Sequence, residues 1–207
     1  MKDNFSEIVV ILDRSGSMGT IVNDTIGGFN SFIKSQKDLN LGECNVTLVQ
    51  FDDKYELNYT SKLSDVKDLS TETYIPRGGT SLLDAIGKTI TEVGSRLVST
   101  PEAMRPSRVI FVIITDGEEN TSKEYRTEQI KTMVEHQTNK YSWDFLYLNC
   151  DLKGFGQARD MGFTQDKSLN YNKMKTGTMY GTFASNVARS RSGLCSSFTP
   201  DQVAANK

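Results

Sequence analysis

The sequence is poor in the side chains on which many enzymes and metal sites depend. Its 207 residues include one histidine, His136, and three scattered cysteines, Cys44, Cys150 and Cys195. One histidine excludes multi-histidine metal sites and leaves little material for a histidine-dependent catalytic triad. An odd number of scattered cysteines does not predict a disulfide framework and is typical of free thiols in a reducing compartment.

Long hydrophobic runs are also absent. No apolar segment approaches the roughly 20 residues that cross a membrane, and the polar start Met1–Asn4 is not followed by the apolar stretch of a signal peptide. Acidic and basic residues nearly balance, 26 against 24, so the net charge of −2 is not that of a typical nucleic-acid-binding protein. We therefore expect a cytoplasmic protein that binds neither membranes nor nucleic acids.

The most informative stretch is Ile8–Met18. It begins with five apolar residues, four of them β-branched, a pattern that favours a strand buried on both faces. Asp13 follows at once, and Ser15 and Ser17 follow at alternate positions. A carboxylate and two hydroxyls would then lie at the carboxyl end of a central strand, where open α/β sheets bind ligands. Oxygen groups of this kind suit a hard cation such as Mg²⁺.

The stretch Asp13–Ser17 resembles the Asp-x-Ser-x-Ser signature of von Willebrand factor A domains, which carry a metal-ion-dependent adhesion site. The family also requires a threonine in a glycine-rich loop and an aspartate at the end of a later buried strand. Thr80, which follows two glycines, and Asp116, which closely follows a second apolar run, supply both in the right order. The resemblance extends from Ile8 to about Arg191.

This resemblance implies a metal site and a mode of action. Ser15 and Ser17 would coordinate Mg²⁺, or Mn²⁺ or Ca²⁺, through their hydroxyls, and Thr80 would join them when a ligand is bound. Asp13 and Asp116 would act directly or through coordinated water. The ion would then hold an Asp or Glu of a partner protein. The resemblance thus implies a protein-binding module that is not an enzyme and has no catalytic residues.

Each of these residues also has a purely structural interpretation. Asp13 and the serines could cap the first helix, Thr80 could cap the helix that follows it, and Asp116 could be an ordinary turn residue. The conjunction of all five favours the metal site.

Charged residues flank the predicted site. Glu118 and Glu119 are expected to form a solvated acidic rim, which disfavours an acidic partner if it lies near the ion. Arg14 and Arg77 are expected to offset this rim by attracting a carboxylate.

The alternation of strands and helices predicts a doubly wound, Rossmann-like α/β fold. We expect a mostly parallel sheet of about six strands, with one antiparallel edge and helices on both faces. The expected strands are residues 8–12, 45–51, 54–59, 109–114, 143–148 and 168–171, and the expected helices are residues 21–39, 81–97, 126–140, a short helix ending at 162, and a C-terminal helix that includes 179–187. Residues 60–74 are expected to form a surface connection.

We expect a single domain over residues 1–194 and a frayed tail over residues 195–207, with Arg189 and Arg191 at a solvated helix end. The last third, including Trp143–Asn149 and Ser185–Ser190, is similar to intracellular prokaryotic and phage A-domain proteins of the tellurite-resistance type.

The same residues give less support to other functions. Asp13 resembles the nucleophile of haloacid-dehalogenase-type phosphatases, but these need a second Asp two residues later, where this chain has Ser15. No glycine-rich nucleotide motif follows the first strand. A metal-dependent phosphohydrolase and a scaffold that does not use the ion remain the alternatives.

Overall fold

A six-stranded sheet forms the centre of the protein in a computed structural model that describes residues 1–150 and 154–207. The strand order is β3-β2-β1-β4-β5-β6. All neighbouring strands run parallel except β2 and β3, which form an antiparallel edge. The strands are β1 (Lys2–Asp13), β2 (Glu43–Phe51), β3 (Tyr55–Lys62), β4 (Pro106–Thr115), β5 (Asp144–Asn149) and β6 (Ser168–Asn170).

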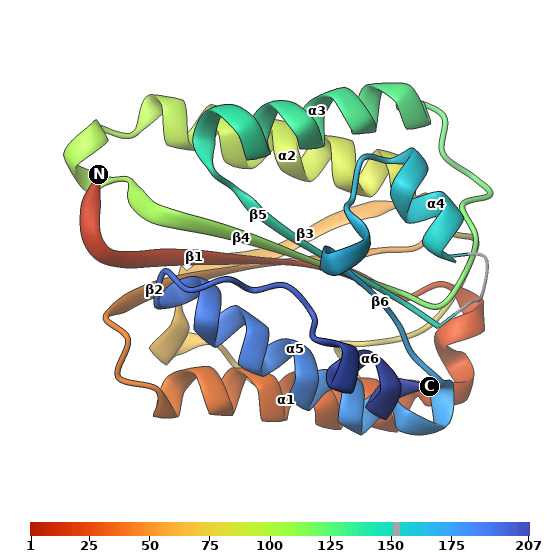
Figure 1. Cartoon of the computed structure of the whole chain (residues 1–207). Helices are drawn as coiled ribbons and strands as arrows, with labels where there is room; N and C mark the ends of the chain where they lie inside the picture. The colour runs from red at the N-terminus through yellow and green to blue at the C-terminus, as the bar shows by residue number, and fades with distance from the viewer. Residues whose placement is uncertain (151–153) are drawn as a thin grey trace.

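Helices cover both faces of this sheet (Figure 1). In the view of Figure 1, α2, α3 and α4 lie above the sheet, and α1, α5 and α6 lie below it. The helices are α1 (Val22–Asp38), α2 (Leu82–Ser99), α3 (Thr127–Tyr141), α4 (Gly154–Asp160), α5 (Thr176–Arg191) and α6 (Pro200–Asn206). The predicted doubly wound, mostly parallel α/β fold is therefore confirmed.

Strand β1 is central because its apolar run supplies two cores at once. Ile8, Val10 and Leu12 belong to the core under α1 and α5, whereas Val9 and Ile11 belong to the core under α2 and α3. Successive side chains of a strand point to opposite faces, so an uninterrupted apolar run is stable only where helices cover both faces. The prediction of a fully buried first strand is confirmed.

The connectivity places a ligand-binding crevice at one end of β1. The chain passes from β1 to β2 on one side and later enters β4 on the other side, so the strand order reverses between β1 and β4. In open α/β sheets, the carboxyl ends of strands at such a switch point form the usual binding crevice. Asp13 ends β1 at this point, and Asp116 directly follows β4.

Three expectations about the surface are wrong. Strand β3 continues to Lys62, and the connection after it packs into the core through Leu63, Val66, Leu69 and Tyr74. The segment expected to fray contains α6, which Thr199 caps by accepting a hydrogen bond from the Gln202 amide. Arg191 is buried, with 6% of its surface exposed, instead of lying solvated at a helix end.

No helix in the described ranges combines the length and the apolar character needed to cross a membrane. No disulfide joins any of Cys44, Cys150 and Cys195.

Candidate functional site

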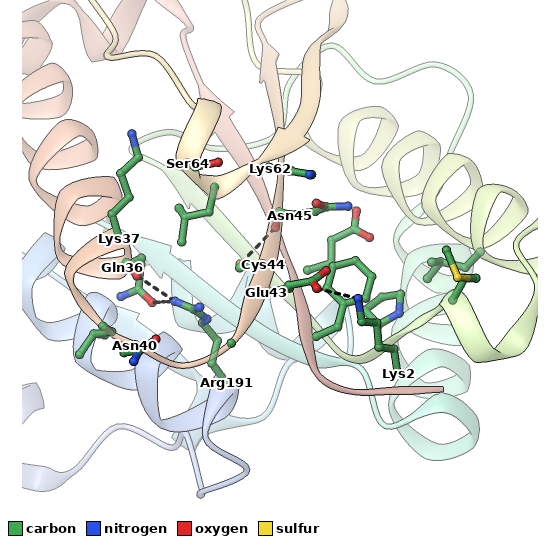
Figure 2. Close-up of a pocket in the computed structure, with 18 of the residues that line it drawn as sticks. Lys2, Gln36, Lys37, Asn40, Glu43, Cys44, Asn45, Lys62, Ser64 and Arg191 are labelled. Atoms are coloured by element: carbon green, nitrogen blue, oxygen red, sulfur yellow. Dashed lines mark hydrogen bonds and ion pairs between the residues drawn. The ribbon is translucent and has the colours of Figure 1, made fainter.

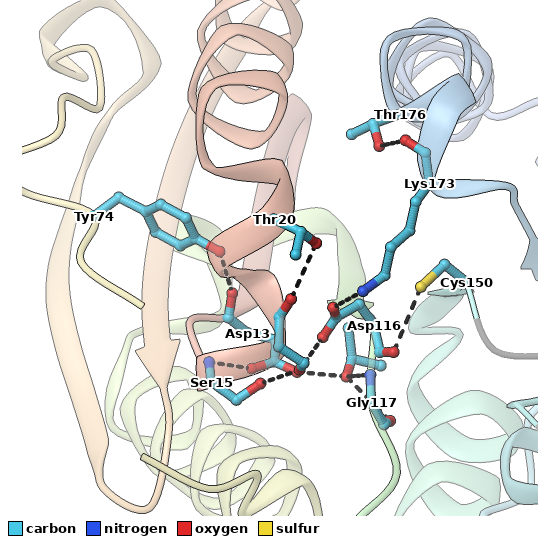
Figure 3. A network of polar contacts seen from close by, with 11 residues as sticks. Asp13, Ser15, Thr20, Tyr74, Asp116, Gly117, Cys150, Lys173 and Thr176 are labelled. Carbon is cyan, nitrogen blue, oxygen red and sulfur yellow. Dashed lines mark hydrogen bonds and ion pairs between the residues drawn. The ribbon is translucent and has the colours of Figure 1, made fainter. Parts of the chain in front are cut away.

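Four of the five predicted site residues are joined by direct contacts at the carboxyl ends of β1 and β4 (Figure 3). The Ser15 amide donates to Oδ1 of Asp13 at 2.6 Å, and the hydroxyls of Ser15 and Ser17 lie 3.0 Å apart. The Ser17 hydroxyl donates to Oδ1 of Asp116 at 2.6 Å. The structure therefore brings together residues that are about 100 positions apart in the sequence.

Thr80 completes this group from the loop that precedes α2. A Cβ atom added to Gly117 would lie 3.4 Å from Oγ of Ser17 and 3.5 Å from Oγ1 of Thr80, so both hydroxyls face Gly117. The Thr80 amide donates to Oδ1 of Asn120 at 2.9 Å, which fixes the loop against the segment that follows β4. Glycine at position 117 thus leaves a small space beside the hydroxyls of two predicted ligands.

Backbone contacts hold the two loops in register. The Gly16 amide donates to the carbonyl of Gly78 at 3.2 Å, and the Arg77 amide donates to the carbonyl of Arg14 at 2.8 Å. The hydroxyl of buried Tyr74 donates to the carbonyl of Asp13 at 2.6 Å. These contacts fix the serine loop and the Thr80 loop relative to one another without using the oxygens of the predicted ligands.

Arg14 and Arg77 are structural in this arrangement. Nε of each guanidinium donates to Oδ2 of Asp52, which is fully buried, at 2.9 and 2.8 Å respectively. Nη2 of Arg14 also lies 2.6 Å from Glu56. The expectation that Arg14 attracts an incoming carboxylate is therefore wrong: it is buried and its charge is already paired. Arg77 is half exposed, but it is anchored to the same aspartate.

The expected acidic rim is also only partly present. Glu119 accepts hydrogen bonds from the amides of Leu83, Thr121 and Ser122 and from the Ser122 hydroxyl. A carboxylate at the first turn of a helix is stabilised by the helix dipole. Glu119 therefore ties the 119–122 loop to the start of α2. Glu118 is exposed.

The two predicted carboxylates have different surroundings. Burial raises the pKa of Asp13 to about 6, although hydrogen bonds from Thr115 and Ser15 oppose the shift. The Thr115 hydroxyl donates to Oδ2 of Asp13 at 2.6 Å. Asp116 instead has a cationic neighbour, because Nζ of Lys173 lies 2.6 Å from its Oδ2. Burial alone lowers the pKa of Lys173, but the contact with Asp116 outweighs burial and raises it.

The donor set fits a hard divalent cation. It consists of two carboxylates and three hydroxyls, and oxygen ligands of this kind are those that Mg²⁺ prefers. Asp13 is buried, and its carboxylate contacts hydroxyl and amide donors without a cationic side chain within ion-pair distance in the described ranges. A buried carboxylate without a counter-charge is unfavourable, and a cation at this position would remove that cost. No group of three or more His, Cys, Asp or Glu residues among the described residues offers another site.

The one histidine of the chain lies away from the site. His136 is exposed on α3, where its ring contacts that of Tyr141, and it is not part of the network at Asp13.

The sequence analysis missed three residues of the site. Thr115 directly precedes Asp116, so its position at the end of a buried strand could have identified it. Tyr74 and Lys173 come from segments without a recognisable motif, and only the fold brings them to Asp13 and Asp116. Lys173 matters most, because it places a positive charge at the predicted cation site.

The chain belongs to the von Willebrand factor type A domain family, whose model matches residues 7–142. Domains of this family are generally protein-interaction modules, and they bind a divalent metal at the adhesion site. The matched range includes Asp13, Ser15, Ser17, Thr80 and Asp116. No curated protein matches the chain at a significant level.

Several solved structures share the fold. The pilus adhesin SpaC from Lactobacillus rhamnosus GG, in its open conformation, is 12% identical with a TM-score of 0.62, covering 91% of this chain and 30% of the adhesin. The PilB minor pilin from Streptococcus sanguinis is 12% identical with a TM-score of 0.60, covering 90% of this chain and 62% of the pilin. Proximal thread matrix protein 1 from the mussel byssus, with a zinc-occupied MIDAS motif, is 15% identical with a TM-score of 0.56. The match covers 87% of this chain and 45% of the matrix protein. This chain thus corresponds to only part of each of them.

Proposed function

We propose that this protein is a metal-ion-dependent protein-binding module whose metal ligands are Asp13, Ser15, Ser17, Thr80 and Asp116. The observation that carries the proposal is the convergence of these five side chains at the switch point between β1 and β4. Asp13 accepts from the Ser15 amide, the Ser15 hydroxyl contacts the Ser17 hydroxyl, and the Ser17 hydroxyl donates to Asp116. Thr80 lies beside these hydroxyls.

The chemistry of the donors supports binding over turnover. Three of the five ligands are neutral hydroxyls, so a bound divalent ion would keep enough positive charge to attract a partner's Asp or Glu. The chain's own residues orient the donors: Thr115 and the Ser15 amide hold Asp13, and Ser17 holds Asp116. No histidine or other positioned base accompanies them in the described network, which disfavours a phosphohydrolase.

The ion is proposed to be Mg²⁺, with Mn²⁺ or Ca²⁺ as substitutes. A cytoplasmic location and the intracellular tellurite-resistance type belong to the same proposal. They are supported by the free cysteines and by the sequence of the last third of the chain.

The test is affinity capture from a native bacterial lysate with Mg²⁺ and with EDTA, followed by mass spectrometry. We expect at least one protein that is retained with Mg²⁺, released by EDTA, and not captured by the Asp13→Ala variant. Capture that resists EDTA, or that Asp13→Ala leaves intact, would contradict the proposal. Phosphatase activity that disappears in Asp13→Ala would favour the alternative function.

A second variant separates metal binding from partner binding. Thr80→Ala should weaken the captured partner's affinity more than it weakens the metal's affinity, because the Thr80 hydroxyl is expected to reach the ion mainly in the partner-bound state. Thr132→Ala, on the exposed face of α3, is the matched control and should change neither affinity. Equal losses of metal and partner affinity in Thr80→Ala would contradict the role assigned to Thr80.

A further inference from the structure

Figure 2 shows a large cavity at the starts of β1 and β2. The proposed metal site lies at the opposite end of the sheet, where β1 ends at Asp13. The cavity has a volume of about 1090 Å³, and its walls come from the first residues of β1 and β2, the end of α1 and the end of α5. Five cationic side chains and three acidic side chains line it. The cavity is therefore large enough for a small ligand, and its lining has a positive balance.

The feature that points to a ligand is Arg191, the last residue of α5. Its Nε donates to the Ser6 hydroxyl at 3.2 Å, and its Nη1 donates to both the backbone carbonyl and the side-chain oxygen of Gln36 at 3.1 Å. Nη2 is buried and has no hydrogen-bond partner. In Figure 2 the guanidinium group lies beside Gln36 among the residues that line the cavity.

Nothing in the described ranges supplies a full counter-charge to this guanidinium. Arg191 forms no ion pair there with Asp or Glu. Burial raises the pKa of the neighbouring Cys44 thiol, so Cys44 does not act as an anionic partner. The carbonyl of Gln36, in the last turn of α1, provides only the partial negative charge of a helix end.

Two of the three acidic residues that line the cavity are ion-paired, and the third, Asp38, is exposed at the end of α1. Glu7 is buried and accepts hydrogen bonds from Thr47 and Arg96 at Oε1, while its Oε2 has no hydrogen-bond partner. It lies next to Ser6 on β1, so the two side chains point to opposite faces of the sheet and Glu7 faces away from Arg191. Glu43 forms an ion pair with Lys2 at 2.7 Å. A buried, hydrogen-bonded cation without an anion is costly, and an anion bound in the cavity would remove that cost.

We propose that this cavity binds a small oxyanion, and that the guanidinium group of Arg191 supplies the counter-charge to its carboxylate or phosphate group. Ser6 and Gln36 hold the guanidinium in place before the ligand arrives, so little side-chain ordering remains to be done on binding. Lys62 also lines the cavity, but it pairs in register with Asn45, which pairs with Glu7, so its side chain lies on the face of the sheet away from Arg191. The site is separate from the proposed metal site, because it lies at the other end of β1, and it does not depend on that proposal.

The test is anion binding to the purified full chain in EDTA, so that no metal-bound anion contributes. Inorganic phosphate and succinate are the two probes, and calorimetry gives the affinity of each. We expect at least one to bind, and to raise the thermal midpoint by about 3–5 °C when present at about ten times its dissociation constant. The probe that binds more tightly identifies the chemistry of the natural ligand.

Substitutions of single residues test whether the anion binds at Arg191. Arg191→Gln should lose the binding, whereas Arg189→Gln, which removes the same charge two residues earlier on α5 and outside the cavity lining, should retain it. Ser6→Ala, which removes the hydroxyl that accepts from Nε of Arg191, should fold and weaken binding by about two- to tenfold. This variant decides the outcome if Arg191→Gln does not fold. Absence of binding by both probes, unchanged affinity in a folded Arg191→Gln, or unchanged affinity in Ser6→Ala would overturn the proposal.

Discussion

The ammonium group of Lys173 lies 2.6 Å from Oδ2 of Asp116, while the Ser17 hydroxyl lies 2.6 Å from Oδ1 of the same carboxylate. The Asp116 carboxylate, a predicted metal ligand, thus contacts the Ser17 hydroxyl through one oxygen and the Lys173 ammonium group through the other. Lys173 comes from the segment before α5. A positive charge next to a proposed cation site opposes the binding of the ion, so we expect Lys173 to lower the affinity for the metal.

Replacing Lys173 by glutamine should therefore strengthen metal binding. Removing one positive charge a few ångströms from the ion should raise the affinity for Mg²⁺ or Mn²⁺ by roughly five- to tenfold. Calorimetric titration measures the change. Lys175→Gln is the matched control, because Lys175 lies two residues away and donates to the carbonyl of Ala205 instead. A weaker or unchanged metal affinity in Lys173→Gln would show that Lys173 does not compete with the ion.

The buried carboxylate of Asp13 should make the metal-free protein sensitive to pH. Burial raises its pKa to about 6, so the folded state holds the proton more tightly than the unfolded state does. The contribution of Asp13 to the free energy of unfolding is then fully present below about pH 4. It is lost as the pH rises through about 6, and the loss is up to about 3 kcal/mol. The Asp13→Asn variant has no carboxyl group at this position, so its free energy of unfolding should not show this loss.

Urea unfolding in EDTA at pH 4.5 and pH 7.5 tests this expectation. Relative to wild type, Asp13→Asn should gain stability between the lower and the higher pH. If the free energies of unfolding of wild type and Asp13→Asn differ by the same amount at both pH values, the pKa of Asp13 is not raised.

The packing of α1 against α5 depends on one glycine. A Cβ atom on Gly28 would lie 2.1 Å from Cδ2 of Tyr180, which is buried against α1, so Gly28→Ala should destabilise the protein by about 1–3 kcal/mol. Gly27 is exposed on the same helix and has nothing within 4 Å of its Cβ position. Gly27→Ala should therefore be neutral or stabilising by about 0.5–1 kcal/mol. Denaturant unfolding compares the two, and equal effects would contradict the close contact.

Asp144 should stabilise the C-terminal part of the chain only while it is ionised. Burial alone raises its pKa, but hydrogen bonds from Lys167, Ser190 and Ser196 outweigh burial and hold the pKa below its usual range. The stabilisation is therefore present above the ordinary carboxyl pKa of about 4, and it is lost as the pH falls through the lower folded value.

Asp144→Asn should cost about 1–3 kcal/mol at pH 7 and progressively less below about pH 4. Unfolding measured across this range gives the profile. Asp160→Asn, an exposed aspartate at the end of α4, is the control and should cost little at any pH. A constant cost for Asp144→Asn would mean that its charge does not contribute.

The fold was predictable where the hydrophobic pattern alone determines it. Strands β1 and β4 have uninterrupted apolar runs because helices cover both of their faces, and such runs are visible in the sequence. The segment after β3 was not recognisable, because Leu63, Val66 and Leu69 are separated by polar residues and are buried only by tertiary packing. The C-terminal helix α6 is short, and its cap at Thr199 carries little signal without the core beneath it.

The candidate site likewise has one part that the sequence predicts and one part that it does not. Asp13, Ser15 and Ser17 are local neighbours and form a recognisable motif. Lys173 reaches Asp116 from 57 residues further along the chain, and Arg14 is neutralised by Asp52 from a different strand end. Such pairings depend on how strands and loops are placed in space, and no local spacing encodes them.

Divalent-ion binding by the serine motif is the central expectation for this protein. Calorimetric titration of the EDTA-treated, dialysed protein with Mg²⁺ and Mn²⁺ measures it. We predict one bound ion per chain in the wild type, loss of binding in Asp13→Asn and in Ser15→Ala, and unchanged binding in the exposed control Thr132→Ala. An absence of binding at millimolar Mg²⁺ and Mn²⁺, or an affinity that Asp13→Asn and Ser15→Ala leave intact, would contradict the account.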